Sequence, residues 1–198
     1  MGRYAKDTGG GDFQDAPIGT HIARCIRLID LGTHESEYQG TKTKRNQIVV
    51  GWELPTELMD DQQPFIVHKF YTNSLSEKSK LRPDLEAWRG RPFSSTELDG
   101  FDLEQILGKC CLVSVIAKQN GGVKVGGLMA LPKGTKVPPA HNDCWAYWIE
   151  SHSEDAFAKV PKGFQKMIME SDEMRDGGPK REPGEDADEP KLDDEIPF

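Results

Sequence analysis

Aromatic and basic side chains stand close together at several places in this sequence, and together they could bind a single-stranded nucleic acid. Bases stack on aromatic rings, which contributes about 1–3 kcal/mol per base, and lysine and arginine neutralise the phosphates. The sequence offers eight candidates for such contacts: Arg24, Tyr38, Lys42, Lys44, Arg45, Lys69, Tyr71 and Lys118. For each, the structural alternative is a hydrated hairpin tip or polar strand face.

The candidates fall on expected strands and hairpins. Tyr38 and the basic run 42–45 lie between the first two expected strands, at a loop that borders the binding face in an OB barrel. Lys69 and Tyr71 are two positions apart in the third expected strand, so they share one face. Arg24 and Arg27 cannot share a strand face, so we expect at most one of them to face DNA.

The tryptophans are expected mainly in the core. Trp52 is in line with the apolar residues of the second strand, and Trp88 with the apolar residues of a helix. Trp145 is crowded with Tyr147 and Trp148, so we expect these rings to be buried against the domain or a second subunit. His68 is expected to be a structural or groove histidine rather than a catalytic base.

The hydrophobic pattern predicts a mainly β fold. Five strands are expected, at residues 20–31, 45–54, 65–72, 110–119 and 123–131. Helical segments are expected at 75–88, 101–107 and 157–169, and residues 145–149 are either a strand or the start of a helix. Five strands with a helical insertion predict a five-stranded OB-fold barrel. The number of strands also fits an SH3-like barrel or a small sandwich.

The charge distribution divides the chain into three parts. The net charge is −8, and residues 170–198 hold 12 acidic and 4 basic residues, whereas the other 21 acidic and 21 basic residues cancel. We therefore expect a flexible arm at 1–16, a nucleic-acid-binding domain at 17–169 and a disordered acidic tail at 170–198. A neutral body leaves room for a local basic groove despite a pI of about 5.2.

The last six residues combine carboxylates with two apolar side chains. They are Asp193, Asp194, Glu195, Ile196, Pro197 and Phe198. Apolar side chains at the tip of a charged tail can dock in a small pocket while the carboxylates meet Arg and Lys around it. Pro197 restricts the backbone and lowers the cost of ordering. We therefore expect this tip to bind partner proteins.

The tip resembles the C-terminus of bacterial single-stranded DNA-binding proteins, which reads Asp-Asp-Asp-Ile-Pro-Phe, with Glu195 as the departure. The body is more similar to phage-encoded single-stranded DNA-binding proteins, which share the OB barrel with larger insertions. The run 42–45 before the strand end Gly51-Trp52-Glu53-Leu54 contributes to this similarity. The resemblance implies a non-catalytic protein that coats single-stranded DNA in replication, recombination or repair and recruits partners through its tip.

Two alternatives stay open at the level of sequence: an adaptor that carries the tip but binds no DNA, and a DNA-annealing recombination protein. The acidic tail is also expected to compete with DNA for the basic groove. The resemblance leaves a phage or a bacterial source open, and the divergent body favours a phage. A homo-oligomer is also possible.

The motifs of several enzyme classes are missing from the sequence. It has no phosphate-binding G-x-x-x-x-G-K-[ST] loop, and its carboxylates fall in turns and the tail, which disfavours an ATPase or a nuclease. No cofactor is expected, and Cys25, Cys110, Cys111 and Cys144 are expected to be buried free thiols rather than metal ligands. No apolar run could span a membrane or act as a secretory signal, so a cytoplasmic location is expected.

Overall fold

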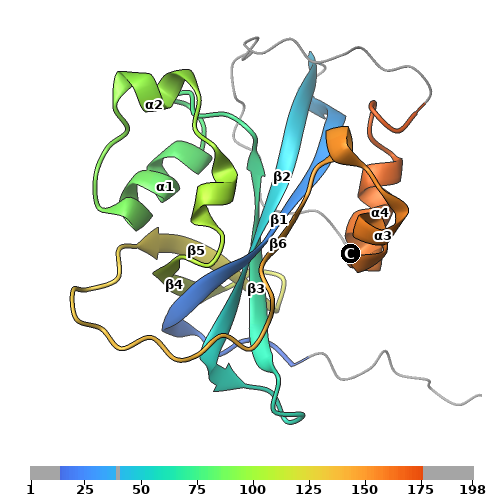
Figure 1. Cartoon of the computed structure of the whole chain (residues 1–198). Coiled ribbons are helices and arrows are strands. Elements are labelled where there is room, and N and C mark those ends of the chain that lie inside the picture. Colours follow the sequence, from blue (N-terminus) through green and yellow to red (C-terminus); the bar gives the residue numbers. More distant parts are fainter. Residues whose placement is uncertain (1–13, 39–40, 176–198) are drawn as a thin grey trace, which may run out of the picture.

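A six-stranded sheet forms the frame of the molecule in the computed structural model, which describes residues 14–38 and 41–175. The strands are β1 (Gly19–Tyr38), β2 (Thr41–Leu58), β3 (Pro64–Thr72), β4 (Cys110–Ala117), β5 (Val123–Met129) and β6 (Trp145–Tyr147). Five of them follow the order β3-β2-β1-β4-β5 with antiparallel neighbours, and the short β6 pairs in parallel with β1 (Figure 1). The prediction of a mainly β fold is confirmed.

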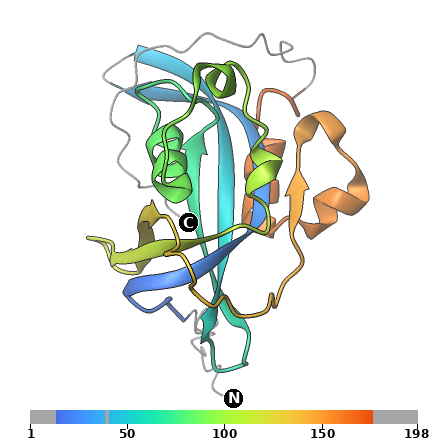
Figure 2. The same cartoon turned by 60° about the vertical axis from the view of Figure 1, so that its left-hand side comes forward.

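Strand β1 belongs to both halves of the sheet. Its first part, residues 19–24, pairs with β4, and its longer second part, from Arg24 to Tyr38, pairs with β2 (Figure 2). Register shifts in this second part, between Cys25 and Arg27 and between Asp30 and Gly32, mark β-bulges. Bulges bend and twist a strand, which allows one long strand to serve two differently directed halves.

Two hydrophobic clusters lie on opposite faces of β2. Its even-numbered residues, including Trp52, face the main core, whereas Val49 faces a second cluster. The main core lies between the sheet and the segment that joins β3 to β4, which contains α1 (Leu81–Arg89), α2 (Ser95–Asp99) and a 3-10 turn, η1 (Leu103–Ile106). Trp52 and Trp88 are buried in this core, as expected.

The second cluster lies under the C-terminal helices. After β6 the chain forms a 3-10 turn, η2 (Ile149–Ser151), and then α3 (Glu154–Lys159) and α4 (Lys162–Met169). Phe164 and Ile168 of α4 pack there against Ile29 and Val49 of the sheet. Figure 1 shows α3 and α4 on the side of the central strands opposite α1 and α2. We call the sheet face that carries Val49 the outer face.

The expected barrel is not closed. No strand pairing joins β3 to β5 within residues 14–38 and 41–175, and both strands remain at the edges of the sheet. A cleft lies between these two edges, and Gln14 to Ala16 also contribute to its lining. A hydrophobic pattern gives the number of strands but not the stagger that closure requires, which is why the sequence analysis predicted a barrel that the sheet does not close.

Strands β1 and β2 extend beyond their predicted ends. Residues 32–44, expected as a loop, are largely strand, because the ladder continues through oppositely charged cross-strand pairs such as Glu35 with Lys44. Pro55 does not end β2, since it lies at the irregularity between Leu54 and Leu58, where the β2–β3 ladder is interrupted.

The helix after β3 begins later than predicted. It starts at Leu81 rather than 75, and the Ser79 hydroxyl accepts a hydrogen bond from the Leu81 amide at 3.1 Å. Pro83 lies in the first turn, where a proline is tolerated. The turn that joins β4 to β5 contains Gly121 and Gly122, which have positive φ angles of 91° and 75°.

The folded part of the chain reaches beyond residue 169. Glu173 accepts hydrogen bonds from the amide and the hydroxyl of Thr33, both at 2.7 Å, and the Asp172 amide donates to the Thr33 carbonyl at 3.0 Å. Gly32 has a φ of 83°, and a side chain there would collide with Ser171. Residues 171–173, which the prediction placed in the tail, are therefore held against β1. The tip 193–198, most of the tail and residues 1–13 of the arm lie outside the described residues.

The cysteines and the helices bear on two further expectations from the sequence. Each cysteine is a free thiol, but only Cys25 and Cys111 are buried, whereas Cys110 is half-buried and Cys144 is exposed. Among the helices of the described ranges, none combines the length and the apolar character needed to cross a membrane.

Candidate nucleic-acid interface

One row of side chains crosses four strands of the outer face. The register aligns Trp145 of β6 with Arg27 of β1, Arg27 with Gly51 of β2, and Gly51 with His68 of β3. Residues directly opposite one another in a sheet point to the same side. We call these four residues the open row. It offers an indole, a guanidinium and an imidazole on one surface.

Gly51 lets Arg27 lie flat across the sheet. A Cβ atom at Gly51 would lie 3.2 Å from the Cβ atom of Arg27, closer than side chains normally approach. The Arg27 guanidinium lies 5.7 Å from the centre of the Trp145 ring, within the range of a cation–π interaction. Its Nε atom is buried and has no hydrogen-bond partner in the structure, and burial lowers the pKa of Arg27. Arg27 as a whole is half-buried, so a phosphate oxygen would have to approach through the exposed part of its side chain rather than at Nε.

His68 lies where the open row meets the edge of the sheet. Its ring contacts Phe70 and Phe164 edge-on, at 5.7 and 5.3 Å between centroids. Burial lowers the pKa of His68, and the positive charges of Lys118 and Arg27 lower it further. The imidazole is therefore neutral near pH 7.

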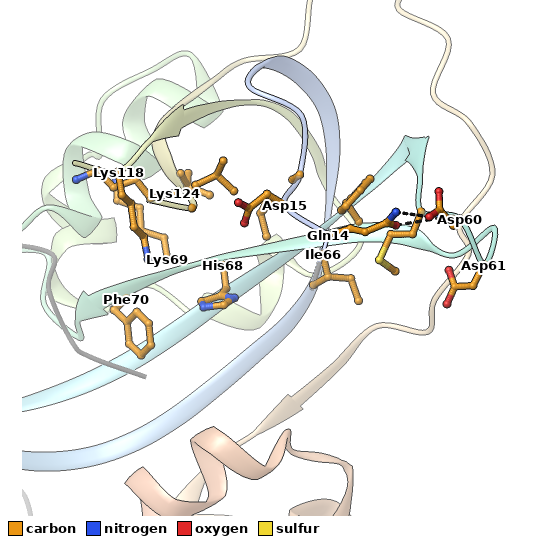
Figure 3. A pocket seen from close by; sticks show the side chains of 17 residues that line it. Gln14, Asp15, Asp60, Asp61, Ile66, His68, Lys69, Phe70, Lys118 and Lys124 are labelled. Atoms are coloured by element: carbon orange, nitrogen blue, oxygen red, sulfur yellow. Dashed lines mark hydrogen bonds between the residues drawn. The ribbon is translucent and has the colours of Figure 1, made fainter. Parts of the chain in front are cut away.

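A cleft of about 910 Å³ opens beside His68, between β3 and β5. Figure 3 shows Ile66, His68 and Phe70 projecting in a row from one side of β3, with Lys69 on the other side. The remaining lining is largely apolar (Ala16, Met59, Phe65, Val67, Val123 and Val125), but the carboxylate of Asp15 lies between the two ends of the cleft (Figure 3).

The two ends of the cleft carry opposite charges. Lys69, Lys118 and Lys124 gather at one end, whereas Asp60 and Asp61 lie at the other (Figure 3). The side-chain amide of Gln14 donates to the Asp60 carboxylate and accepts from the Asp60 amide at 3.1 Å, which fixes the chain at the acidic end. The lysine end suits phosphates and the apolar wall suits bases, whereas the acidic end repels a phosphate backbone.

Two walls bound the open row along the strands. On one side α4 covers Val49 and Phe70, and on the other the loop before β6 is bonded to Glu53. Val49 and Glu53 are four residues apart on β2, which is about 13 Å of strand. Between the walls Gly51 is buried and Arg27, His68 and Trp145 are half-buried, so the accessible band is narrow.

The basic hairpin predicted from the sequence is paired with acidic residues. Lys42 lies 2.7 Å from Glu35, and Lys44 lies 2.8 Å from Asp172, which raises the pKa of Lys44. Arg45 is buried, with 8% of its surface exposed. The backbone of Tyr38 pairs with Thr41 at the end of the hairpin, but its side chain lies outside the described part of the chain.

Lys69 and Tyr71 share a face, as predicted, but this face is turned toward the main core. The Tyr71 ring is 3% exposed, and its hydroxyl donates to Asp84 at 2.7 Å. Lys69 forms an ion pair with the same carboxylate at 2.7 Å. Tyr71 is therefore not exposed for base stacking in this conformation, because its side of β3 packs against α1 rather than facing solvent.

Arg24 and Lys118 lie in different surroundings. Arg24 is bonded to Glu53 and to the Pro138 carbonyl, so it holds a loop rather than projecting into solvent. Lys118 lines the cleft beside His68. Of the eight predicted contact residues, the structure brings only Lys69 and Lys118 to this cleft.

Trp145, Phe70 and Lys124 belong to this surface but were not among the predicted contact residues. Of the pair Arg24 and Arg27, the prediction chose Arg24, whereas it is Arg27 that lies in the open row. Trp145 is half-buried rather than enclosed, although its neighbour Tyr147 is buried as expected. A glycine in the middle of an apolar strand, Gly51, was the available signal, since such a glycine often marks the close approach of another group.

Within the described ranges, no group of three or more His, Cys, Asp or Glu side chains could hold a metal ion. The comparisons with known proteins add no relative: no family model matches the chain, and the search of curated proteins finds no significantly similar sequence.

Proposed function

We propose that this protein binds single-stranded DNA on its outer face and at the lysine end of the β3–β5 cleft. The observation that carries the proposal is the open row, in which Arg27 lies against the Trp145 ring and beside His68. A stacking ring with an adjacent guanidinium is the combination that sequence-tolerant binding of single strands requires. The neighbouring Lys118 and Lys124 would continue the phosphate path.

The arrangement of the strands supports an OB-fold assignment. A long β1 shared between two sheet halves, the order β3-β2-β1-β4-β5, and helices between β3 and β4 are the expected layout of that fold. The OB fold is a partly open five-stranded barrel that binds oligonucleotides on its strand 2–3 face and between its 1–2 and 4–5 loops. The open row crosses β2 and β3, and the cleft reaches the β4–β5 hairpin.

The sequence of the last six residues supports a second activity. Its similarity to the tip of bacterial single-stranded DNA-binding proteins favours recruitment of replication, recombination or repair proteins. The protein would then coat and protect exposed single strands without catalysis, as a phage-type member of that class. Deletion of Phe198 alone should abolish capture of a tip-binding partner and leave DNA affinity unchanged.

Titration of oligo-dT into the full chain at low salt tests the DNA claim. Tryptophan emission should change on binding, since Trp145 is half-exposed in the open row. An unlabelled single strand should displace bound oligo-dT efficiently, whereas a duplex of equal length should displace it poorly, because the band between the two walls is narrow. Unchanged emission together with no gel shift would leave the tip-bearing adaptor as the better description.

Matched lysine pairs make this test specific. The double change Lys118→Ala and Lys124→Ala removes two charges from the cleft. Changing Lys133 and Lys136 to alanine removes two exposed charges from the loop after β5 and keeps the same net charge. Only the first pair should weaken DNA binding, and equal weakening by both pairs would indicate a general charge effect.

A further inference from the structure

A fully buried carboxylate lies next to the open row. Glu53 belongs to β2, two residues from Gly51 on the same face, and none of its side-chain surface is exposed. Its oxygens accept four hydrogen bonds: from the His141 amide at 3.3 Å, the Asn142 amide at 3.0 Å, the Asn142 side chain at 2.9 Å and Arg24 at 3.3 Å. Burying a charge is costly unless it is paired and bonded in this way.

Arg24 extends this network to a second point of the same loop. Its Nη1 atom bonds Glu53, and its Nη2 atom donates to the Pro138 carbonyl at 2.7 Å. The segment between β5 and β6 contains no helix or strand, so its position depends on such side-chain contacts. Two side chains of the sheet thus hold this loop at residues 138, 141 and 142.

The fixed loop leads directly into the aromatic residue of the open row. Trp145 follows Asn142 by three positions, and the Cys144 thiol between them donates to the Cys25 carbonyl at 3.6 Å. Trp145 then pairs with Arg27 at the start of β6. Any displacement of residues 141–142 would be passed to the indole through this short connection.

We infer that Glu53 is a positioning residue: through the loop 138–142, and together with Arg24, it holds the Trp145 ring beside Arg27. This inference rests on the proposed DNA-binding function. Glu53 itself is enclosed by its four donors and touches no ligand.

The chemistry of the site requires a carboxylate rather than an amide. Glu53 meets only donors, which is the role of an ionised carboxylate with two accepting oxygens. A glutamine has one accepting oxygen, and its NH₂ group would face a donor in place of the second. Leaving buried donors unsatisfied is costly, so the loop should move away from β2 in a Glu53→Gln variant.

The test compares Glu53→Gln with Glu97→Gln. Glu97 makes a similarly dense set of bonds, to Arg89, Arg91 and the Ser94 amide, but at α2, on the opposite side of the sheet. Hydrogen exchange of residues 138–147, measured without DNA, should accelerate in Glu53→Gln and stay unchanged in Glu97→Gln. Equal exchange of this segment in Glu53→Gln and in the unaltered chain would overturn the inference.

A double-mutant cycle tests whether Glu53 acts through Trp145. Glu53→Gln should lower oligo-dT affinity about tenfold, as expected for loss of one stacking ring. In a Trp145→Ala background the same change should have almost no effect, because the ring to be positioned is already missing. An equal loss in both backgrounds would show that Glu53 acts by another route.

Asn142→Ala provides a second variant in case Glu53→Gln does not fold. It removes the 2.9 Å side-chain bond to Glu53 and keeps the carboxylate and both backbone bonds. The same acceleration of exchange and the same dependence on Trp145 are expected, to a smaller extent. If the unaltered chain fails to bind oligo-dT, the proposed function fails, whereas the exchange result still decides whether Glu53 holds the loop.

Discussion

Two neighbouring rows of the same sheet face have opposite characters. We call the first one the covered row. It lies two residues beyond the open row along β1 and β6 and consists of Tyr147, Ile29, Val49 and Phe70. It packs against Phe164 and Ile168 of α4 and belongs to the second hydrophobic cluster. The open row has Trp145, Arg27, Gly51 and His68 at the equivalent positions. The covered row is enclosed under α4, whereas the open row is only partly covered: Trp145 packs at the margin of the second cluster and His68 packs on Phe164, and both remain half-buried.

The comparison shows how one sheet face can serve both folding and binding. The backbone geometry of the two rows is the same, so side-chain type makes the difference. In the covered row, Val49 fills the space under α4. In the open row, Gly51 leaves space that the Arg27 side chain occupies. Changes in the covered row should therefore affect stability, and changes in the open row should affect binding.

The largest effect is expected in the cluster over the covered row. Ile168 is completely buried there, so Ile168→Ala should lower the free energy of unfolding by about 2–5 kcal/mol. Urea denaturation followed by circular dichroism measures this change. Oligo-dT affinity of the remaining folded protein should be unchanged, and a large loss of affinity in folded protein would remove the distinction between the rows.

Removal of the Trp145 ring should lower DNA affinity more than it lowers stability. Trp145→Ala should weaken oligo-dT binding by about 1–3 kcal/mol, the contribution of one stacked base. The free energy of unfolding should fall less than in Ile168→Ala, because Trp145 is half-buried and Ile168 is completely buried. Fluorescence anisotropy of a labelled oligonucleotide gives the affinity, and equal affinity with and without the ring would remove Trp145 from the interface.

Charge removal at the cleft should change the salt dependence. Log affinity falls with log salt by about 0.7 per phosphate neutralised on a single strand. Lys118→Ala should therefore make the slope shallower by about 0.7, and Lys133→Ala should not change it. Titrations at several salt concentrations measure the slope. An unchanged slope in Lys118→Ala would place the phosphate path elsewhere.

The smallest effect concerns the pH dependence of stability. The pKa of His68 is lowered in the folded protein, so below the ordinary value of about 6.5 the unfolded chain binds a proton that the folded chain does not. Stability should therefore be lost as the pH falls from 6.5 through the lowered pKa. His68→Phe should reduce the fall in unfolding free energy between about pH 7.5 and 5.5. An identical fall in His68→Phe would show that other groups cause it.

The strands and the core were largely predictable from the sequence. Alternation around Trp52 placed β2 and its buried face correctly, and the predicted strands 110–119 and 123–131 correspond to β4 and β5. The composition of the outer surface was less predictable, because it depends on how the strands align with one another and on which helix covers each face. Strand spacing placed Lys69 and Tyr71 on one face but did not show that α1 covers that face.

The open row could not be derived from local pattern. It joins residues from four strands, and the alignment of Arg27 with Gly51 depends on a β-bulge after Cys25. One inserted residue moves every later side chain to the other face. Trp145 comes from a three-residue strand whose partner is more than a hundred residues earlier in the chain. Neither feature leaves a periodic signal.

Photocross-linking tests the central claim most directly, by asking which row a single strand touches. An oligonucleotide containing bromodeoxyuridine would be bound to the full chain, irradiated and mapped by mass spectrometry. The account predicts cross-links to Trp145 and to the β3 segment with His68, and none to α4 residues over the covered row. Cross-links confined to the 42–45 hairpin or to α4, or no cross-links at saturating oligonucleotide, would contradict it.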